Sequence, residues 1–288
     1  MKISFDSQLK QYRAMINEYL ESVEFDSDDN IVARAMAYSI ASGGKRIRPT
    51  IAIACADALD GDREMALAFG CAVEMIHTST LIHDDLPCMD NDDLRRGKPS
   101  CHKKFGEAYA VLAGDALLIA AYDIIAKVED EKKAMEFVKV LSEASGVRGV
   151  GGGQGYDIAA ETTSADYDML MKIHSGKTAA LILAAARGGA IAGGERPDFF
   201  KEYALSLGLA FQIRDDILDF EGNEEKLGKR TGVDVANNKA TFVTVLGMQS
   251  AKAALERETD RALESIQKLG DKGEFLRSLA LHLRTRDN

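Results

Sequence analysis

Residues Ile51–Ala58 read IAIACADA and residues Leu181–Ala186 read LILAAA, so both stretches are apolar around nearly their whole circumference when drawn as helices. Such helices must be enclosed by other helices, because none of their faces suits water. Working outward from both stretches, helical periodicity continues, and few runs alternate as half-buried strands do. We therefore expect an all-α protein built as a single large helical bundle. Bundles of this kind carry ligand sites on side chains that project inward from facing helices.

Helices are predicted wherever a period of 3.6 residues fits best. These segments are Ile31–Ser42, Pro49–Leu59, Arg63–Asp85, Ala108–Val128, Glu131–Ser145, Ala165–Arg187, Asp198–Phe220 and Ala240–Leu269. The glycine clusters Gly43-Gly44, Gly151-Gly152-Gly153 and Gly193-Gly194 are predicted to end helices. No linker-like stretch divides the chain, so residues 1–288 are expected to form one domain.

The composition excludes several classes of protein. With 46% hydrophobic and 28% charged residues, the 288-residue chain has a globular composition, and its net charge of −10 argues against broad nucleic-acid binding. The four cysteines show no metal-ligand spacing, so we expect them to be reduced in the cytoplasm. The N-terminus lacks the apolar stretch of a signal peptide, and the most apolar segment, Thr178–Gly194, contains Arg187 and four glycines. We therefore expect no membrane span.

The first group of acidic residues follows the predicted helix that starts at Arg63. It reads HDDLPCMDNDD from His83 to Asp93 and holds five carboxylates. One interpretation is a solvated helix end, but carboxylates there repel one another and oppose the helix dipole. A cation would remove that cost. Oxygen ligands without His or Cys favour Mg²⁺, which usually shares its coordination sphere with substrate phosphates.

The second group reads FQIRDDILD from Phe211 to Asp219. Asp215 and Asp219 are four residues apart and share one helix face, with Asp216 beside them. Taken alone, this motif is as compatible with a structural role as with a functional one. Two such motifs on apolar helices, far apart in sequence, favour a facing pair across the interior of the bundle.

Basic residues lie close to these motifs in sequence. The segment Gly43–Pro49, GGKRIRP, concentrates three cations between two predicted helices, and Arg95-Arg96 directly follows the first acidic group. A surface patch is the alternative, but a rigid Lys/Arg turn in an acidic protein is suited to holding a diphosphate. His77 lies two helical turns before Asp84 and shares its face. A lone helical histidine is more often a core residue, but the acidic motif on the same face favours a ligand contact here.

Taken together, these motifs resemble the trans-isoprenyl diphosphate synthase family, specifically the short-chain farnesyl and geranylgeranyl diphosphate synthases of bacteria and plastids. The resemblance covers nearly the whole chain. Its motifs are GGKRIRP, EMIHTSTLIHDDLPCMDNDDLRRGKP from Glu74, FGEAYAVLAGDALL from Phe105, GGQGYD from Gly152, IHSGKTAAL from Ile173, FQIRDDILD, and LGKRTGVD…NNKAT between Leu227 and Thr241.

The resemblance implies a role for each matching residue. Asp84, Asp90 and Asp215 are expected to bind Mg²⁺, or Mn²⁺ in its place, in a site of three ions, with Asp85, Asp216 and Asp219 in support. Isopentenyl diphosphate would be held by Lys45, Arg48, His77 and Arg96. The allylic diphosphate would be surrounded by Arg95, Lys177, Thr178, Gln212, Lys229 and Lys239, with Lys177 also counted among the catalytic residues. The family fold is a helical bundle around a deep central cavity, the isoprenoid synthase fold, and its members are usually homodimers.

The implied chemistry needs no protein nucleophile. Mg²⁺ and the cations stabilise the departing diphosphate, the isopentenyl double bond attacks the allylic cation, and the released diphosphate accepts the proton. A terpene cyclase is one alternative, but it would not need the Lys45 and Arg48 site. A non-catalytic regulatory subunit is another, but such subunits commonly lack one acidic motif, and both motifs are present in this chain. The chain departs from the family at Phe242-Val243, where an aromatic residue and proline are usual, and its C-terminal tail matches only loosely.

Product length depends on the residues one helical turn before Asp84, which form the floor for the growing tail. These positions hold Ser79 and Thr80, whereas bacterial relatives that make farnesyl diphosphate usually place a large aromatic residue at the position of Ser79. Small side chains leave room for one more isoprene unit. Geranylgeranyl diphosphate is therefore the expected product, with farnesyl diphosphate as the alternative.

Overall fold

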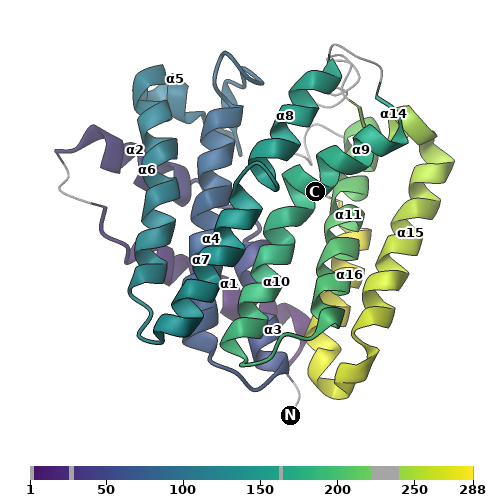
Figure 1. Cartoon of the computed structure of the whole chain (residues 1–288). Helices are drawn as coiled ribbons and strands as arrows, with labels where there is room; N and C mark the ends of the chain where they lie inside the picture. The colour runs from purple at the N-terminus through teal and green to yellow at the C-terminus, as the bar shows by residue number, and fades with distance from the viewer. Residues whose placement is uncertain (1–2, 26–28, 162–164, 222–239, 288) are drawn as a thin grey trace.

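The computed structural model describes residues 3–25, 29–161, 165–221 and 240–287, and these residues are almost entirely helical (Figure 1). The helices are α1 Phe5–Glu21, α2 Ile31–Ala41, α3 Ile47–Ala58, α4 Arg63–Asp84, α5 Cys101–Phe105, α6 Glu107–Ala126, α7 Glu131–Ser145, α8 Val150–Glu161, α9 Tyr167–His174, α10 Ala180–Ala192, α11 Asp198–Glu221, α14 Phe242–Leu246, α15 Met248–Ser265 and α16 Glu274–Thr285. A π-helical turn, Ser175–Ala179, joins α9 to α10, and a 3₁₀ turn, Gln267–Gly273, precedes α16. Strands β1 Leu94–Arg95 and β2 Lys98–Pro99 form a short antiparallel hairpin. The all-α prediction is confirmed.

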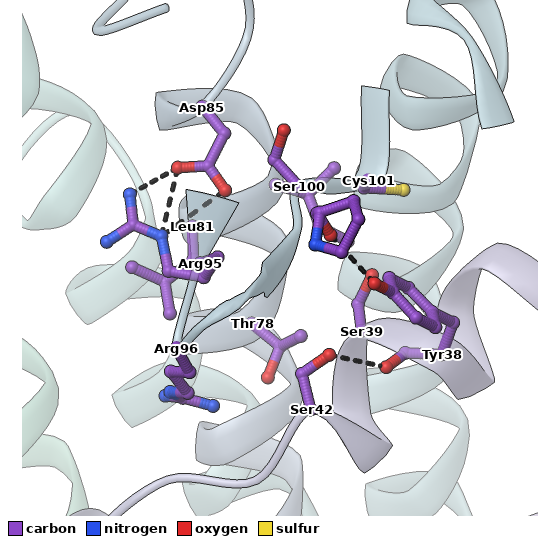
Figure 2. A pocket seen from close by; sticks show the side chains of 12 residues that line it. Tyr38, Ser39, Ser42, Thr78, Leu81, Asp85, Arg95, Arg96, Ser100 and Cys101 are labelled. Carbon is purple, nitrogen blue, oxygen red and sulfur yellow. Dashed lines mark hydrogen bonds and ion pairs between the residues drawn. The ribbon is translucent and has the colours of Figure 1, made fainter. Parts of the chain in front are cut away.

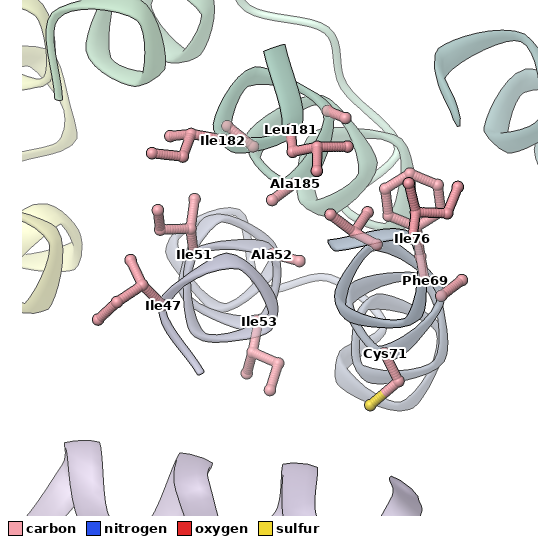
Figure 3. Close-up of a cluster of buried hydrophobic side chains, with 14 of the residues drawn as sticks. Ile47, Ile51, Ala52, Ile53, Phe69, Cys71, Ile76, Leu181, Ile182 and Ala185 are labelled. Atoms are coloured by element: carbon pink, nitrogen blue, oxygen red, sulfur yellow. The ribbon is translucent and has the colours of Figure 1, made fainter. Parts of the chain in front are cut away.

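Helices α3 and α10 lie inside the bundle, as their apolar sequences predict. Ten of the twelve residues of α3 are buried, and α3 packs against both α4 and α10. Figure 3 shows Ile51 and Ala52 of α3 beside Leu181 of α10. Glycine permits this packing: a Cβ on Gly188 of α10 would lie 2.0 Å from the Phe69 ring of α4. The enclosed helices therefore fix the geometry of the helices that carry the acidic motifs, α4 and α11.

The glycine clusters give a mixed result. The predictions for Gly43-Gly44 and Gly193-Gly194 are confirmed, because α2 and α10 end just before them. The prediction for Gly151–Gly153 is wrong, because all three residues lie inside α8. A Cβ on Gly153 would lie 2.2 Å from the Lys177 backbone nitrogen, so this glycine allows α8 to approach the π-helical turn.

Two long predicted helices are divided in the structure. The predicted helix over 165–187 contains α9, the π-helical turn and the start of α10. The predicted helix over 240–269 is interrupted between α14 and α15 at Gly247, whose positive φ of 81° ends the first helix. Helices α1, α5, α8 and α16 were not among the predicted elements.

Two helices among the described residues, α4 and α6, are long and apolar enough to cross a membrane by length and composition. Within its most apolar window α4 is 72% buried inside the bundle, which is the state of a core helix. The corresponding window of α6 is only 39% buried. Much of this apolar window of α6 is therefore exposed. Figure 1 shows α6 toward one side of the bundle.

Candidate active site

The first acidic motif is built where α4 ends. Asp84 is the last residue of α4, and the backbone nitrogen of Asp90 donates to the Asp84 carbonyl at 2.8 Å, which folds the motif back on itself. Burial raises the pKa of Asp84 to about 6, against the nearby charge of Lys177, while Asp90 and Asp85 raise it further. The half-buried Asp84 carboxylate therefore lacks full charge compensation, and a cation would stabilise its ionised form.

Asp85 is held by the hairpin that follows. Its carboxylate is 2% exposed and accepts from Arg95, whose Nε lies 3.0 Å from Oδ1 (Figure 2). Burial raises the pKa of Asp85 although Arg95 opposes the shift. Arg95 also pairs with Asp92 at 3.2 Å. Arg95, which we expected at the allylic diphosphate, is thus oriented by two carboxylates of the first motif.

A small hollow of about 30 Å³ lies on the α2 side of this motif (Figure 2). Its lining includes the hydroxyl residues Ser39, Ser42 and Thr78 together with Arg95 and Arg96. Its volume is large enough to hold ordered water.

The second acidic motif lies on α11, and its aspartates have different environments. Asp216 is 3% exposed and accepts from Gln212 Nε2 at 2.8 Å and from the Phe242 backbone nitrogen at 2.7 Å. Thr178 Oγ1 donates to Gln212 Oε1 at 2.7 Å. Thr178, Gln212 and Asp216 therefore form one hydrogen-bonded chain that joins the π-helical turn to α11 and α14. Asp215 is more exposed and pairs with Arg286 at 2.8 Å.

Lys177 projects from the π-helical turn and pairs with Asp157 of α8 at 2.6 Å. A π-helical turn carries one extra residue, which changes the direction of the side chains that follow. The positive charge of Lys177 also opposes the rise in the pKa of Asp84 that burial causes.

Three cationic residues follow Gly44, and the middle one, Arg46, has a structural role. Arg46 is 5% exposed, adopts a left-handed conformation with φ 53°, and pairs with buried Glu74 at 3.1 Å. Its Nε donates to Asn17 at 3.0 Å and its Nη2 to the Ile40 carbonyl at 2.8 Å. Arg46 thus fixes the turn that carries Lys45 and Arg48.

The remaining basic groups gather around His77. Burial lowers the pKa of His77 well below its usual value, and the charges of Arg48, Arg96 and Arg95 add to the shift. The Arg96 guanidinium donates to the Gly43 carbonyl and would lie 2.7 Å from a Cβ at Gly44. The side-chain-free backbone of the glycine pair therefore lets Arg96 reach the turn.

The three parts of the site face one another. Helix α11 packs against α10 and α16, and both of these helices pack against α3, which begins in the basic turn. Burial lowers the pKa of Arg48, while Glu74 and, to a smaller extent, Asp215 raise it. Lys177 is held against α8 by its ion pair with Asp157. The predicted residues Lys229 and Lys239 lie outside the described residues. The structure thus brings α4, α11, the basic turn and the π-helical turn to one region, while the role of each residue stays a prediction.

The donor set fits Mg²⁺. Among the described residues, no three Asp, Glu, His or Cys side chains come close enough to form a metal site by themselves. Mg²⁺ commonly takes only one or two carboxylates and completes its sphere with water and substrate phosphate. Asp84 and Asp90 from α4 and its turn, and Asp215 from α11, offer oxygen ligands in this manner.

Ser79 and Thr80, the predicted floor, lie on α4. Ser79 is 1% exposed and its hydroxyl donates to the Ile76 carbonyl at 2.8 Å, while the Thr80 hydroxyl donates to the His77 carbonyl at 2.8 Å. Both hydroxyls therefore have hydrogen-bond partners within the helix, and both side chains are small.

Sequence reasoning missed three contributors: Asp157, Glu74 and Arg286. Asp157 lies in the GGQGYD motif, but its partner Lys177 is 20 residues away. Glu74 lies one turn before Thr78 and could have been singled out as a charge in an apolar helix. Arg286 was left aside because the tail matched the family only loosely.

Comparison with known proteins identifies the family. Residues 29–278 match the polyprenyl synthetase family model. The chain is 40% identical to farnesyl diphosphate synthase of Geobacillus stearothermophilus over 98% of its own length and 97% of the relative. It is 43% identical to geranylgeranyl pyrophosphate synthase 11 of Arabidopsis thaliana over 89% of its length and 75% of the relative.

Solved structures agree with this result. A farnesyl/geranylfarnesyl (FPP/GFPP) synthase of Zymomonas mobilis superposes with a TM-score of 0.86 at 36% identity, covering 98% of this chain and 99% of the other. A geranyltransferase of Helicobacter pylori, solved with magnesium and isoprenyl diphosphate, gives a TM-score of 0.84 at 30% identity, covering 98% of both chains. The isoprenoid synthase fold is confirmed, and the chain belongs to the polyprenyl synthetase family.

Proposed function

We propose that this protein is a Mg²⁺-dependent short-chain prenyltransferase that condenses isopentenyl diphosphate with allylic diphosphates and makes geranylgeranyl diphosphate. The observation that carries the proposal is the convergence of two acidic motifs with two separate groups of cations. One group is Lys45, Arg48 and Arg96, near His77, and the other is Arg95 and Lys177. Two diphosphates need two such groups.

The described residues have distinct tasks in this reaction. Arg95 and Lys177 would bind the diphosphate of the allylic substrate, and the basic turn would bind the second diphosphate. Mg²⁺, when held by Asp84, Asp90 and Asp215, would neutralise the charge that develops on the leaving diphosphate. The carbon–oxygen bond of the allylic substrate breaks, a carbon–carbon bond forms to the isopentenyl double bond, and the released diphosphate takes the proton.

Thr178 and Gln212 hold in place the elements that carry these groups. Their hydrogen bonds to each other and to Asp216 hold the π-helical turn against α11. This arrangement preorganises Lys177 and Asp215 before substrate arrives, which avoids reorganisation during the reaction.

The product assignment depends on Ser79. The relatives include both farnesyl and geranylgeranyl diphosphate synthases, so similarity supports either product. The small buried side chain at this position favours the longer product, because a tail extending from the metal site along α4 meets less bulk there. One isoprene unit is about as long as one helical turn.

The test is incubation of the purified protein with Mg²⁺, radiolabelled isopentenyl diphosphate and an allylic starter, followed by chromatography of the dephosphorylated products. We expect a twenty-carbon alcohol from the natural protein and from Ser79→Ala, and a fifteen-carbon alcohol from Ser79→Tyr. A fifteen-carbon product from the natural protein would refute the assignment of product length. Absence of any elongation would favour the regulatory-subunit alternative.

A further inference from the structure

One motif of the sequence, FGEAYAVLAGDALL from Phe105, has no part in the site described so far. Most of it lies on α6, which packs along α4 (Figure 1). Gly114 of this motif is buried, and a Cβ there would lie 2.1 Å from Nε2 of His83, the residue immediately before Asp84. The missing side chain therefore leaves a notch on α6, beside Gly114, that receives the His83 imidazole.

Two hydrogen-bond acceptors face the imidazole in this notch. His83 Nε2 lies 3.2 Å from the Val111 carbonyl oxygen and 3.7 Å from Asp115 Oδ1. A carbonyl and an ionised carboxylate can only accept, so the hydrogen is on Nε2 and His83 donates to Val111. The Asp115 carboxylate is 67% exposed, and solvent therefore weakens its attraction. The hydrogen bond to Val111 ties the last turn of α4 to α6.

This tie acts where α4 has few bonds of its own. Asp84 is the last residue of the helix, and the last carbonyls of a helix lack partners within it. The turn of the acidic motif hangs on them: the Leu86 backbone nitrogen donates to the His83 carbonyl at 3.1 Å. On the other side of Asp84, the Asp85 carboxylate is held by Arg95. Asp84 thus lies between two residues whose side chains are fixed to different elements.

We propose that His83 is a positioning residue of the first acidic motif: the notch beside Gly114 holds its imidazole, and this contact sets the direction of the neighbouring Asp84 carboxylate. The inference rests on the function proposed above, in which Asp84 binds Mg²⁺. His83 acts only through Asp84. Removing a group that orients a metal ligand typically costs about 10–100-fold in metal affinity or activity.

Two substitutions break the contact from opposite sides. His83→Ala removes the imidazole, whereas Gly114→Ala fills the notch and forces the imidazole to turn outward, which its 34% exposed side chain can do without unfolding the bundle. Each should lower kcat by about 10–100-fold. KM for isopentenyl diphosphate should be unchanged, because the basic turn is untouched. His83→Gln keeps an N–H donor near the position of Nε2 and should restore most of kcat.

The double variant separates positioning from general damage. If Gly114→Ala acts only by displacing the imidazole, nothing is left to displace in His83→Ala, and the double variant should be as active as His83→Ala alone. Independent effects would instead multiply to a loss of about a hundredfold or more. Gly114→Ala also places a better helix former inside α6, so its midpoint of urea unfolding should not fall although its kcat does.

Hydrogen–deuterium exchange of the metal-free protein provides a measurement that needs no activity. The backbone nitrogens of Leu86 and Asp90 donate to the carbonyls of His83 and Asp84, so the turn is protected only while the end of α4 is held in place. The peptide that covers residues 85–93 should therefore exchange faster in both single variants than in the natural protein. In the double variant it should exchange as fast as in His83→Ala.

The outcomes distinguish this inference from the proposed function. A natural kcat in either single variant, or a multiplied loss in the double variant, would overturn the inference and leave the metal assignment intact. If the natural protein elongates nothing, the proposed function fails, and exchange alone decides the tie. Faster exchange in both single variants would then support it, and unchanged exchange would exclude it.

Discussion

Asp84 and Asp215 are both expected to bind metal, yet their surroundings differ. Burial raises the pKa of Asp84 and neighbouring carboxylates add to the shift, whereas Asp215 forms an ion pair with buried Arg286. Asp84→Ala and Asp215→Ala should each lower turnover by at least about a hundredfold, because charge on the leaving group loses stabilisation. Without Mg²⁺ their stabilities should differ. Asp84→Ala should be as stable as the natural protein or more so, while Asp215→Ala should lose about 1–3 kcal/mol because Arg286 is left without its carboxylate partner.

Steady-state kinetics and urea denaturation in EDTA test this prediction. Asp93→Ala is the control, since Asp93 belongs to the same acidic group but is paired with Lys103 on the surface at 2.8 Å. It should keep near-natural activity and stability. Near-natural turnover in Asp84→Ala would show that the metal assignment is wrong.

His77 should make stability depend on pH. Burial and the surrounding arginines lower its pKa in the folded state, so the folded protein holds this imidazole neutral while the unfolded chain protonates it near pH 6.5. Its contribution to stability is therefore complete above about pH 6.5 and is lost as pH falls below that value, with a slope of at most about 1.4 kcal/mol per pH unit. Urea unfolding between pH 5 and 8 should show a shallower decline for His77→Gln than for the natural protein. Parallel curves would contradict the prediction.

The elements that carry the site were predictable to different degrees. Helices α4 and α11 follow from periodicity, and the spacing of Asp215 and Asp219 places both on one face of α11. The π-helical turn was not predictable, because its extra residue leaves the apolar pattern of 165–187 nearly unchanged. The structural role of Arg46 was hidden as well, since its partner Glu74 comes from another helix and adjacent cations look alike in sequence.

Helix α8 and the π-helical turn approach each other closely at Gly153, and this contact should control the position of Lys177. A Cβ at Gly153 would lie 2.2 Å from the Lys177 nitrogen, so Gly153→Ala must push α8 and the turn apart and shift Lys177 relative to Asp84. We expect kcat/KM to fall by about a hundredfold, the loss typical of misplacing a reacting group by about 1 Å. Gly155→Ala, on the same helix with open space around it, is the control and should keep activity while gaining about 0.5–1 kcal/mol of stability. Equal activity of the two variants would contradict this view of the turn.

At the scale of the whole molecule, the fold class was predictable from the sequence, but the long-range contacts were not. Apolar helices such as α3 and α10 specify that other helices surround them, and this is enough to predict an all-α bundle. The seat of Arg286 on α11 joins residues 71 positions apart, and no local pattern in the tail encodes it. Contacts of this kind depend on the completed packing of α16 against α11.

The exposed face of α6 is the place where the bundle should meet a second copy. Leu112 is 51% exposed and Ile119 is 66% exposed; they are seven residues apart and so lie on one face of the helix. Val111 and Tyr109 extend this apolar surface. Burying a fully exposed large apolar side chain is worth about 1.5–3 kcal/mol, so covering these partly exposed ones is worth a fraction of that each. A two-fold pairing of α6 with itself would cover the same residues on both protomers.

The protein should therefore be a dimer of about twice its 31.2 kDa chain mass, as the family resemblance also implies. Ile119→Lys combined with Leu112→Lys should give a folded monomer, because two pairs of like charges would face each other across the two-fold axis without solvent. Val147→Lys, at a position 85% exposed in the turn after α7, is the control and should remain dimeric. Analytical ultracentrifugation over a range of concentrations distinguishes the states, and circular dichroism checks that the double variant is folded. A natural protein that sediments as a monomer, or a double variant that sediments as a dimer, would exclude α6 as the interface and leave its exposed apolar face to be covered in another way.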